Sequence, residues 1–223
     1  MAHINKLHYK ENLKSIKSDV VAKGIFEDDK KHWTITSGQM KGKVGDLAFS
    51  FNEKEKTLFF GLGKKKEATA ENFRRAAGSV VNFVIDKKYG SLAVECPTGG
   101  MEAYNCQAFT EGLILSSYRF LDYFSDERAN YYLKNITMVG TCNKNASKKG
   151  VIIANAVCDS RDLGNHPGNV TTPTRLANFA KEVGKKGNMK ITIFDRDKFT
   201  KMGMGSFAGV ALGTNEPPKF IIM

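Results

Sequence analysis

The sequence predicts an α/β protein built in two regions, the first of which holds a mixed sheet flanked by helices. Short apolar runs alternate with longer segments whose apolar residues recur every three or four positions, an order typical of βαβ units. Residues 164–173 are rich in Pro, Gly and Asn and separate two sets of such elements. We therefore expect a first α/β domain over residues 1–148. A connecting helix and the opening part of a second α/β domain follow over residues 149–223.

The predicted strands of the first domain begin near residue 20. Leu47, Phe49 and Phe51 alternate strictly with other residues, which indicates a strand. Turn-forming residues such as Gly42, Gly45 and Asn52 separate the apolar runs. The runs that fit strands are 20–26, 47–51, 58–60, 91–95 and 136–139.

Two helices of the first domain are predicted from helical spacing. Phe73, Ala77, Val80 and Val84 lie on one continuous face, and Thr69 precedes them as an N-cap. The second helix is expected over residues 101–120. Residues 143–150 are polar and contain lysines, and we predict a loop there.

The second region begins with a predicted helix over residues 151–163 and an irregular turn over residues 164–171. Thr172 is expected to cap the next helix, with Pro173 at its first position, where a missing N–H is tolerated. Strands follow at 190–194 and 219–223, and Asp195 is expected to cap a short helix over 198–202. The last strand is apolar after its lysine, as in strands buried on both faces. We therefore expect further protein to cover it.

Net charge, hydropathy and cysteine spacing argue against several classes of protein. The formal net charge is +11, but the lysine pairs are scattered, so we expect at most weak, non-specific binding to nucleic acid. No apolar run reaches the length of a membrane span, and the N-terminus lacks a signal peptide, which favours a cytoplasmic protein. The four cysteines form no C-x-x-C pair and have no histidines at ligand spacing. We expect buried free thiols in a reducing compartment and no zinc site.

Several short motifs invite a functional interpretation, and in each a structural role is favoured. Gly61-Leu62-Gly63 follows a strand and precedes a helix, but it lacks the Walker A spacing, so tight packing of the turn is preferred over phosphate binding. Gly203-Met204-Gly205-Ser206-Phe207-Ala208 fits the dinucleotide fingerprint in letters only, and close helix packing is preferred. Ser206 does not lie in a nucleophile elbow.

The titratable residues form no recognisable catalytic or metal-binding pattern. His166 is a lone imidazole in the predicted turn, and His3, His8 and His32 fall in a polar N-terminal region. A further acidic pair, Asp195 and Asp197, has too few oxygens around it for a cation site. From the residues alone we assign no catalytic, cofactor-binding or metal-binding residue to this chain.

The sequence around the predicted turn resembles the junction segment of the leucyl aminopeptidase (cytosol aminopeptidase) family. The resemblance rests on Arg161-Asp162-Leu163, Asn165, Pro167, Asn169 and Thr172-Pro173, and it continues through Leu176-Ala177, Met202-Gly203-Met204-Gly205 and Pro217-Pro218. Upstream it is firm from Glu111-Gly112-Leu113 and Ser117-Tyr118. These landmarks occur in the family's order and at about its spacing.

The resemblance implies a macro-domain-like first domain followed by the start of a peptidase domain. The family removes N-terminal residues from peptides with two divalent metal ions, zinc or manganese, and typically forms homo-hexamers. Its metal ligands lie in glycine-rich segments that would follow residue 223, so we expect the 223-residue chain to bind no metal ion and to be inactive alone. The alternative is a non-catalytic module that binds nucleic acid through its basic surface or a nucleotide in a macro-like pocket.

Overall fold

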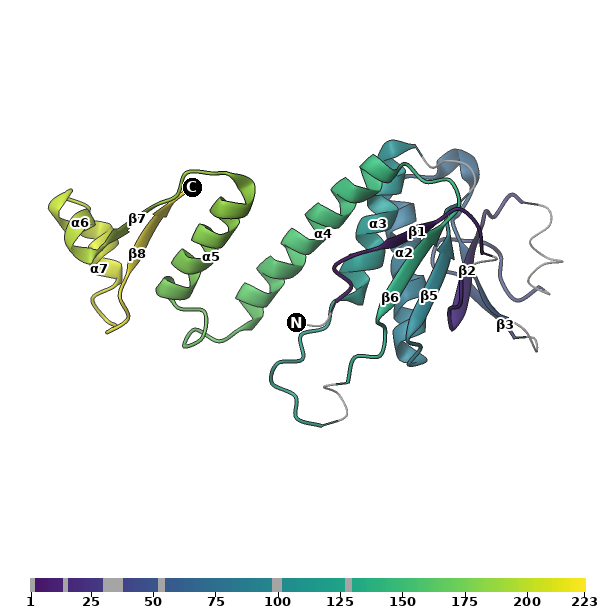
Figure 1. Cartoon of the computed structure of the whole chain (residues 1–223), viewed down its shortest axis with the longest axis horizontal. Helices are drawn as coiled ribbons and strands as arrows, with labels where there is room; N and C mark the ends of the chain where they lie inside the picture. Colours follow the sequence, from purple (N-terminus) through teal and green to yellow (C-terminus); the bar gives the residue numbers. More distant parts are fainter. Residues whose placement is uncertain (1–2, 14–15, 30–37, 52–54, 98–101, 127–129) are drawn as a thin grey trace. The chain divides into compact units, whose positions relative to one another are not determined.

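The computed structural model describes the chain except for residues 1–2, 14–15, 30–37, 52–54, 98–101 and 127–129. It contains two compact units, residues 1–160 and residues 161–223 (Figure 1). The boundary predicted after residue 148 falls inside helix α4, Lys144–Asn165, which contributes residues to both units. His32 lies outside the described residues.

The first unit is organised around a six-stranded mixed sheet with the strand order β1-β6-β5-β2-β4-β3. Every neighbouring pair is parallel except β3 and β4, which are antiparallel. The predicted mixed α/β architecture is therefore confirmed. The strands are β1 His8–Lys10, β2 Val20–Ile25, β3 Leu47–Phe51, β4 Lys56–Gly61, β5 Ser91–Glu95 and β6 Asn135–Val139.

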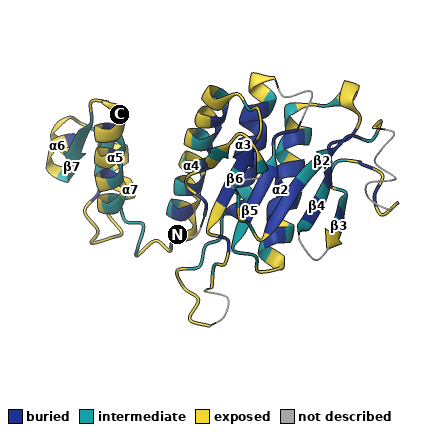
Figure 2. Ribbon diagram, turned by 45° about the vertical axis from the view of Figure 1, so that its right-hand side comes forward, coloured by how far each residue is buried: buried dark blue, intermediate teal, exposed yellow. Residues whose placement is uncertain are grey.

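Helices α2, Ala70–Asp86, and α3, Ala103–Ser117, pack against each other beside the sheet. The predicted cap of α2 is confirmed, since the Thr69 hydroxyl accepts the Asn72 N–H at 3.3 Å. Figure 2 shows the buried residues gathered on the central strands and on the helices beside them. The core includes the fully buried side chains of Phe60, Phe73 and Phe109.

The loop predicted over residues 143–150 is wrong, because α4 already begins at Lys144. The Asn143 side-chain oxygen accepts the Ala146 N–H at 3.0 Å and caps this first turn. Ser147 is fully buried and its hydroxyl bonds that of Thr110 in α3 at 2.7 Å. The first turn of α4 thus packs against α3 through two hydroxyl groups rather than through apolar side chains, so a hydropathy pattern does not reveal it.

Strand β1 was not predicted, because its residues are mainly polar. It lies at the sheet edge and pairs with β6 in parallel register, with Lys10 opposite Val139. An edge strand has one unpaired side and little buried surface, so polar residues are compatible with it.

The second unit contains α5, Pro173–Gly187, and a two-stranded antiparallel sheet of β7, Thr192–Asp195, and β8, Lys219–Ile222. The predicted Thr172 cap is confirmed, since its hydroxyl accepts the Arg175 N–H at 3.3 Å. Two short helices lie between the strands: α6, Arg196–Lys201, and the unpredicted α7, Gly205–Val210.

One expectation for the second unit needs correction, and another agrees with the structure. Helix α4 continues through Asn165, two residues beyond the predicted end, so the irregular turn begins at His166. Strand β8 is only half-buried within the described chain and Ile222 is exposed, which agrees with the expectation that the described residues do not cover this apolar strand. No helix in the described part of the chain combines the length and apolar character that crossing a membrane requires.

Candidate functional site

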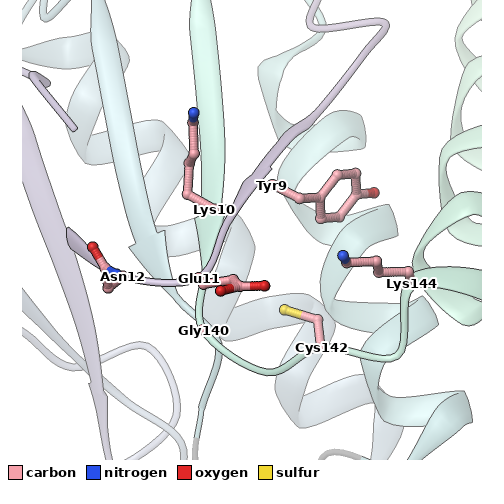
Figure 3. Close-up of a pocket in the computed structure, with 7 residues that line it drawn as sticks. All are labelled: Tyr9, Lys10, Glu11, Asn12, Gly140, Cys142 and Lys144. Carbon is pink, nitrogen blue, oxygen red and sulfur yellow. The ribbon is translucent and has the colours of Figure 1, made fainter. Parts of the chain in front are cut away.

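A pocket of about 350 Å³ lies where β1 and β6 end, beside the first turn of α4 (Figure 3). The carboxyl ends of parallel strands share one edge of a sheet, and such edges commonly hold ligands in α/β proteins. The Gly140 N–H donates to the Lys10 carbonyl at 2.9 Å and holds the two strand ends together. The lining residues are Tyr9, Lys10, Glu11, Asn12, Gly140, Cys142 and Lys144.

The side chains of this pocket carry both signs of charge. Figure 3 shows the Glu11 carboxylate and the Lys144 ammonium group pointing toward the space beside Cys142, whereas Lys10 points away from it. Tyr9 turns toward α4, where its hydroxyl lies 2.9 Å from that of Ser147. The pocket can therefore bind a small polar molecule, and it presents a sulfur atom to that molecule.

Cys142 is joined to Cys96 by a disulfide, with the two Cα atoms 6.1 Å apart. The expectation of four free thiols is therefore wrong for this pair. The expectation of buried thiols holds for Cys106 and Cys158, which are buried and lie outside the disulfide, and burial raises the pKa of the Cys106 thiol. The pairing had no sequence signal, because 46 positions separate the two residues and the sheet alone brings them together.

A second charged cluster ties α2 to α3 and has a structural role. Glu111 is buried and accepts two hydrogen bonds from Arg74, at 2.7 and 3.1 Å, and one from Gln107 at 2.8 Å. Burial works against the Arg74 charge, but its hydrogen bonds to Glu111 and Glu71 outweigh this and raise the pKa of the guanidinium group. This carboxylate is therefore fully engaged within the fold.

Comparison with known proteins identifies the family. The model of the cytosol aminopeptidase family's N-terminal domain matches residues 33–127, and that of its catalytic domain matches residues 159–223. Together the two models span most of the chain, in the family's order. The chain belongs to the cytosol aminopeptidase family.

Curated members of the cytosol aminopeptidase family match nearly the whole chain. A probable cytosol aminopeptidase from Sulfurihydrogenibium sp. is 29% identical, with 95% of this chain and 47% of the relative covered. One from Bdellovibrio bacteriovorus is 34% identical over 84% of this chain and 39% of the relative. The chain thus spans about half the length of the curated relatives it matches.

Similar solved structures also match this chain over about half of their own length. The bottromycin maturation enzyme BotP is similar with a TM-score of 0.79 and 26% identity, covering 92% of this chain and 45% of that enzyme. A tomato leucine aminopeptidase mutant has the same fold at 21% identity, with a TM-score of 0.77, covering 97% of this chain and 50% of that one. These matches confirm an N-terminal domain followed by the start of the catalytic domain.

Two residues that carry the resemblance to the cytosol aminopeptidase family have clear structural roles. Glu111 anchors the buried cluster with Arg74, and Gly112 lets α3 approach α2. A Cβ atom on Gly112 would lie 2.3 Å from the Arg74 carbonyl oxygen and 2.9 Å from the Ala77 Cβ. This part of the motif is therefore explained by helix packing rather than by chemistry.

The loop Gly61-Leu62-Gly63 is confirmed as a tightly packed turn. The N–H groups of Gly61, Leu62 and Gly63 donate to backbone carbonyls at 2.9, 3.0 and 2.9 Å. A Cβ atom on Gly61 would lie 2.0 Å from the Lys43 carbonyl oxygen. None of these three N–H groups is left to bind a phosphate.

The glycines of the fingerprint-like segment do not pack closely, which corrects the preferred interpretation. An added Cβ on Gly203 or Gly205 would meet no atom within 4 Å. Gly203 has φ +78° and follows Met202, the C-cap of α6, and Gly205 begins α7 with Ser206 after it. The segment connects two short helices, whereas dinucleotide binding needs a strand before the glycines.

The two acidic candidates, Asp195 and Asp197, lie at the end of β7 and at the start of α6. Asp195 takes the predicted N-cap position of α6, but its side chain makes no cap hydrogen bond. Its carboxylate instead accepts from the Lys219 ammonium group across the β7–β8 pair. Asp197 lies in the first turn of α6.

The three described histidines, His3, His8 and His166, are not gathered into a cluster. His166 lies in the turn after α4, where its N–H donates to the Asp162 carbonyl at 3.1 Å, and His8 is exposed in β1. His3 is partly buried near Tyr118, with ring centroids 6.3 Å apart. Among the described residues, no three of His, Cys, Asp and Glu come close enough to hold a metal ion.

Proposed function

We propose that this chain forms the N-terminal domain and the first part of the catalytic domain of a metal-dependent aminopeptidase that removes N-terminal residues from peptides. The observation that carries the proposal is the order of the two family models, N-terminal domain over residues 33–127 and catalytic domain over residues 159–223. Structural similarity to BotP over 92% of the chain supports the same assignment.

The metal chemistry implied for the family needs two divalent ions, zinc or manganese, that activate water and stabilise the tetrahedral intermediate. The described residues of this chain do not fit such a site. Asp195 bonds Lys219, Glu111 bonds Arg74, and no cluster of metal ligands forms in the described ranges. We therefore assign no metal ligand to this chain and propose that the 223-residue chain is inactive alone.

Location and assembly are also proposals that rest on the family. Its name and the relatives' names favour a cytoplasmic protein, and the family resemblance favours a homo-oligomer, in particular a hexamer. The parallel strands flanked by helices in the first unit support a macro-like domain as the N-terminal component.

The alternative function is a non-catalytic binding module. The net charge of +11 favours it, since clustered lysines would attract nucleic acid. The lysine pairs, however, lie on separate elements: Lys87 and Lys88 after α2, Lys148 and Lys149 in α4, and Lys185 and Lys186 in α5. This dispersal favours the aminopeptidase proposal.

The test compares the purified 223-residue chain with the native protein isolated from its own cells through an antibody to residues 1–160. Both are assayed with leucine amide in zinc or manganese, with and without a chelator, and the native mass is measured. We expect no turnover by the 223-residue chain and chelator-sensitive turnover by a native protein about twice as long, as in the relatives. Chelator-sensitive turnover by the 223-residue chain itself would contradict the proposed inactivity. A native protein without aminopeptidase activity would contradict the proposed function.

A further inference from the structure

The Cys96–Cys142 disulfide joins the carboxyl end of β5 to the segment between β6 and α4. Its Cα separation of 6.1 Å lies within the range that disulfides span without backbone movement. The Cys96 N–H donates to the Val139 carbonyl at 2.8 Å, so the sheet itself holds Cys96 beside the end of β6. The two thiols of the reduced protein are therefore already positioned for bond formation.

The two sulfur-bearing residues differ in access to solvent. Cys96 is 6% exposed and belongs to the buried core, whereas Cys142 is partly exposed and lines the pocket at the ends of β1 and β6. Cys106 and Cys158 are fully buried. A reagent in the pocket therefore reaches Cys142 before any of the other three cysteines.

The surroundings of Cys142 determine its reactivity. Cys142 lies two positions before Lys144, the first residue of α4, and helix N-termini and neighbouring lysines stabilise the reactive thiolate. The Lys144 side chain points toward the same space (Figure 3). Glu11 also points there and works against the thiolate, so the two side chains have opposite effects that can be separated by substitution.

We propose that Cys142 is a thiolation site that reacts with low-molecular-weight disulfides of the glutathione class, and that Cys96 is its resolving cysteine. The Cys142 thiolate attacks one sulfur of the small disulfide, forms a mixed disulfide and releases one small thiolate. The Cys96 thiolate then attacks the Cys142 sulfur, forms the Cys96–Cys142 bond and releases the second small thiolate. Two protein thiols are oxidised and one small disulfide is reduced to two thiols.

The pocket has the size and polarity for one glutathionyl half of such a reagent. Its volume of about 350 Å³ falls within the range of small-molecule sites. Lys144 offers a cation for the carboxylates of a peptide-like thiol, and Glu11 offers an anion for its ammonium group. In a cytoplasmic protein such a pair would be a reversible redox site rather than a permanent structural bond.

The test uses the 223-residue chain, fully reduced and then placed in mixtures of reduced and oxidised glutathione. Free thiols are alkylated, and intact mass and peptide mapping locate every disulfide. We expect the wild-type chain to lose two hydrogen atoms and to yield a Cys96–Cys142 cross-linked peptide. The Cys96→Ser variant should accumulate glutathione on Cys142, whereas the Cys142→Ser variant should not accumulate it on Cys96. The Cys96→Ala variant and circular dichroism control for folding.

Charge substitutions in the Cys96→Ser background test how the charges near Cys142 affect its reactivity. Lys144→Gln should slow alkylation of Cys142 and Glu11→Gln should speed it, each by roughly threefold, the change that about 0.6 kcal/mol of lost charge interaction produces. Failure of the wild-type chain to form the Cys96–Cys142 bond in any glutathione mixture would overturn the proposal. Glutathione found on Cys96 in preference to Cys142 would overturn the assignment of roles.

Discussion

The two units of this chain differ in how much of their apolar surface they bury. In the first unit, Phe60, Phe73 and Phe109 are fully buried together with the central strands. In the described part of the second unit, Phe199 is the one large apolar side chain buried to that extent. Several apolar residues of the second unit are exposed: Leu176, Met189, Met202, Phe207, Val210, Leu212, Ile222 and Met223.

This difference shows that the helices and strands of the described second unit share only a small aromatic core, in which Phe207 packs edge-on against the buried Phe199. A short segment buries a smaller fraction of its surface than a longer one, so the second unit has little hydrophobic stabilisation of its own. Its order depends on local features, such as the Thr172 cap and the Asn188 C-cap of α5. We therefore expect substitutions of the same type to have larger effects in the first unit when they remove packing, and similar effects when they remove a cap.

The largest expected effect comes from truncating a buried phenylalanine of the first unit, and an exposed phenylalanine of the second unit serves as the comparison. Phe109 is fully buried and stacks on Phe60 with ring centroids 5.9 Å apart, so Phe109→Ala should destabilise the first unit by about 3–5 kcal/mol. Phe207 is 37% exposed, and Phe207→Ala should cost less than about 2 kcal/mol. Hydrogen exchange in increasing urea, read peptide by peptide, measures both. Equal losses in the two variants would contradict the difference in burial.

The next largest effect comes from replacing a helical glycine by alanine in each unit. We expect this substitution to destabilise the first unit and to stabilise the second. Gly112→Ala in α3 would force a Cβ against the Arg74 carbonyl oxygen and the Ala77 Cβ, at a cost of about 1–3 kcal/mol. Gly209→Ala in α7 meets no atom within 4 Å and should stabilise that helix by about 0.5–1 kcal/mol. Thermal unfolding of the first unit and hydrogen exchange of α7 are the measurements. Destabilisation by Gly209→Ala would show that the second unit packs more closely than we infer.

The smallest expected difference between the two units comes from the loss of a helix N-cap. Thr69→Ala and Thr172→Ala each remove one hydroxyl that accepts a backbone N–H at 3.3 Å, and each should cost about 1 kcal/mol. In α5 this corresponds to roughly fivefold faster local hydrogen exchange, because a cost of that size changes an opening equilibrium by that factor. In α2 the surrounding core should confine the increase to the first turn. Serine at either position should restore the wild-type rates, and no change in α5 would contradict its dependence on the cap.

Much of the secondary structure could be predicted because its signals are local. The alternation of Leu47, Phe49 and Phe51 predicted β3, and the spacing of Phe73 and its partners predicted α2. The family motifs from Arg161 to Pro173 predicted the family that the comparisons show. The first turns of α4 escaped prediction, because the buried Ser147 contacts a hydroxyl in α3 rather than an apolar side chain.

The sequence by itself determined most of the elements, their order and the family, because periodicity, capping residues and motif spacing act over a few neighbouring positions. Only the tertiary structure decided which distant residues meet. Parallel pairing of β6 with both β1 and β5 creates the pocket and brings Cys142 to Cys96, 46 positions away. The close crossing of α2 and α3 likewise explains why residue 112 is glycine and why Glu111 can be buried. These contacts depend on strand order and helix packing, which no short stretch of sequence encodes.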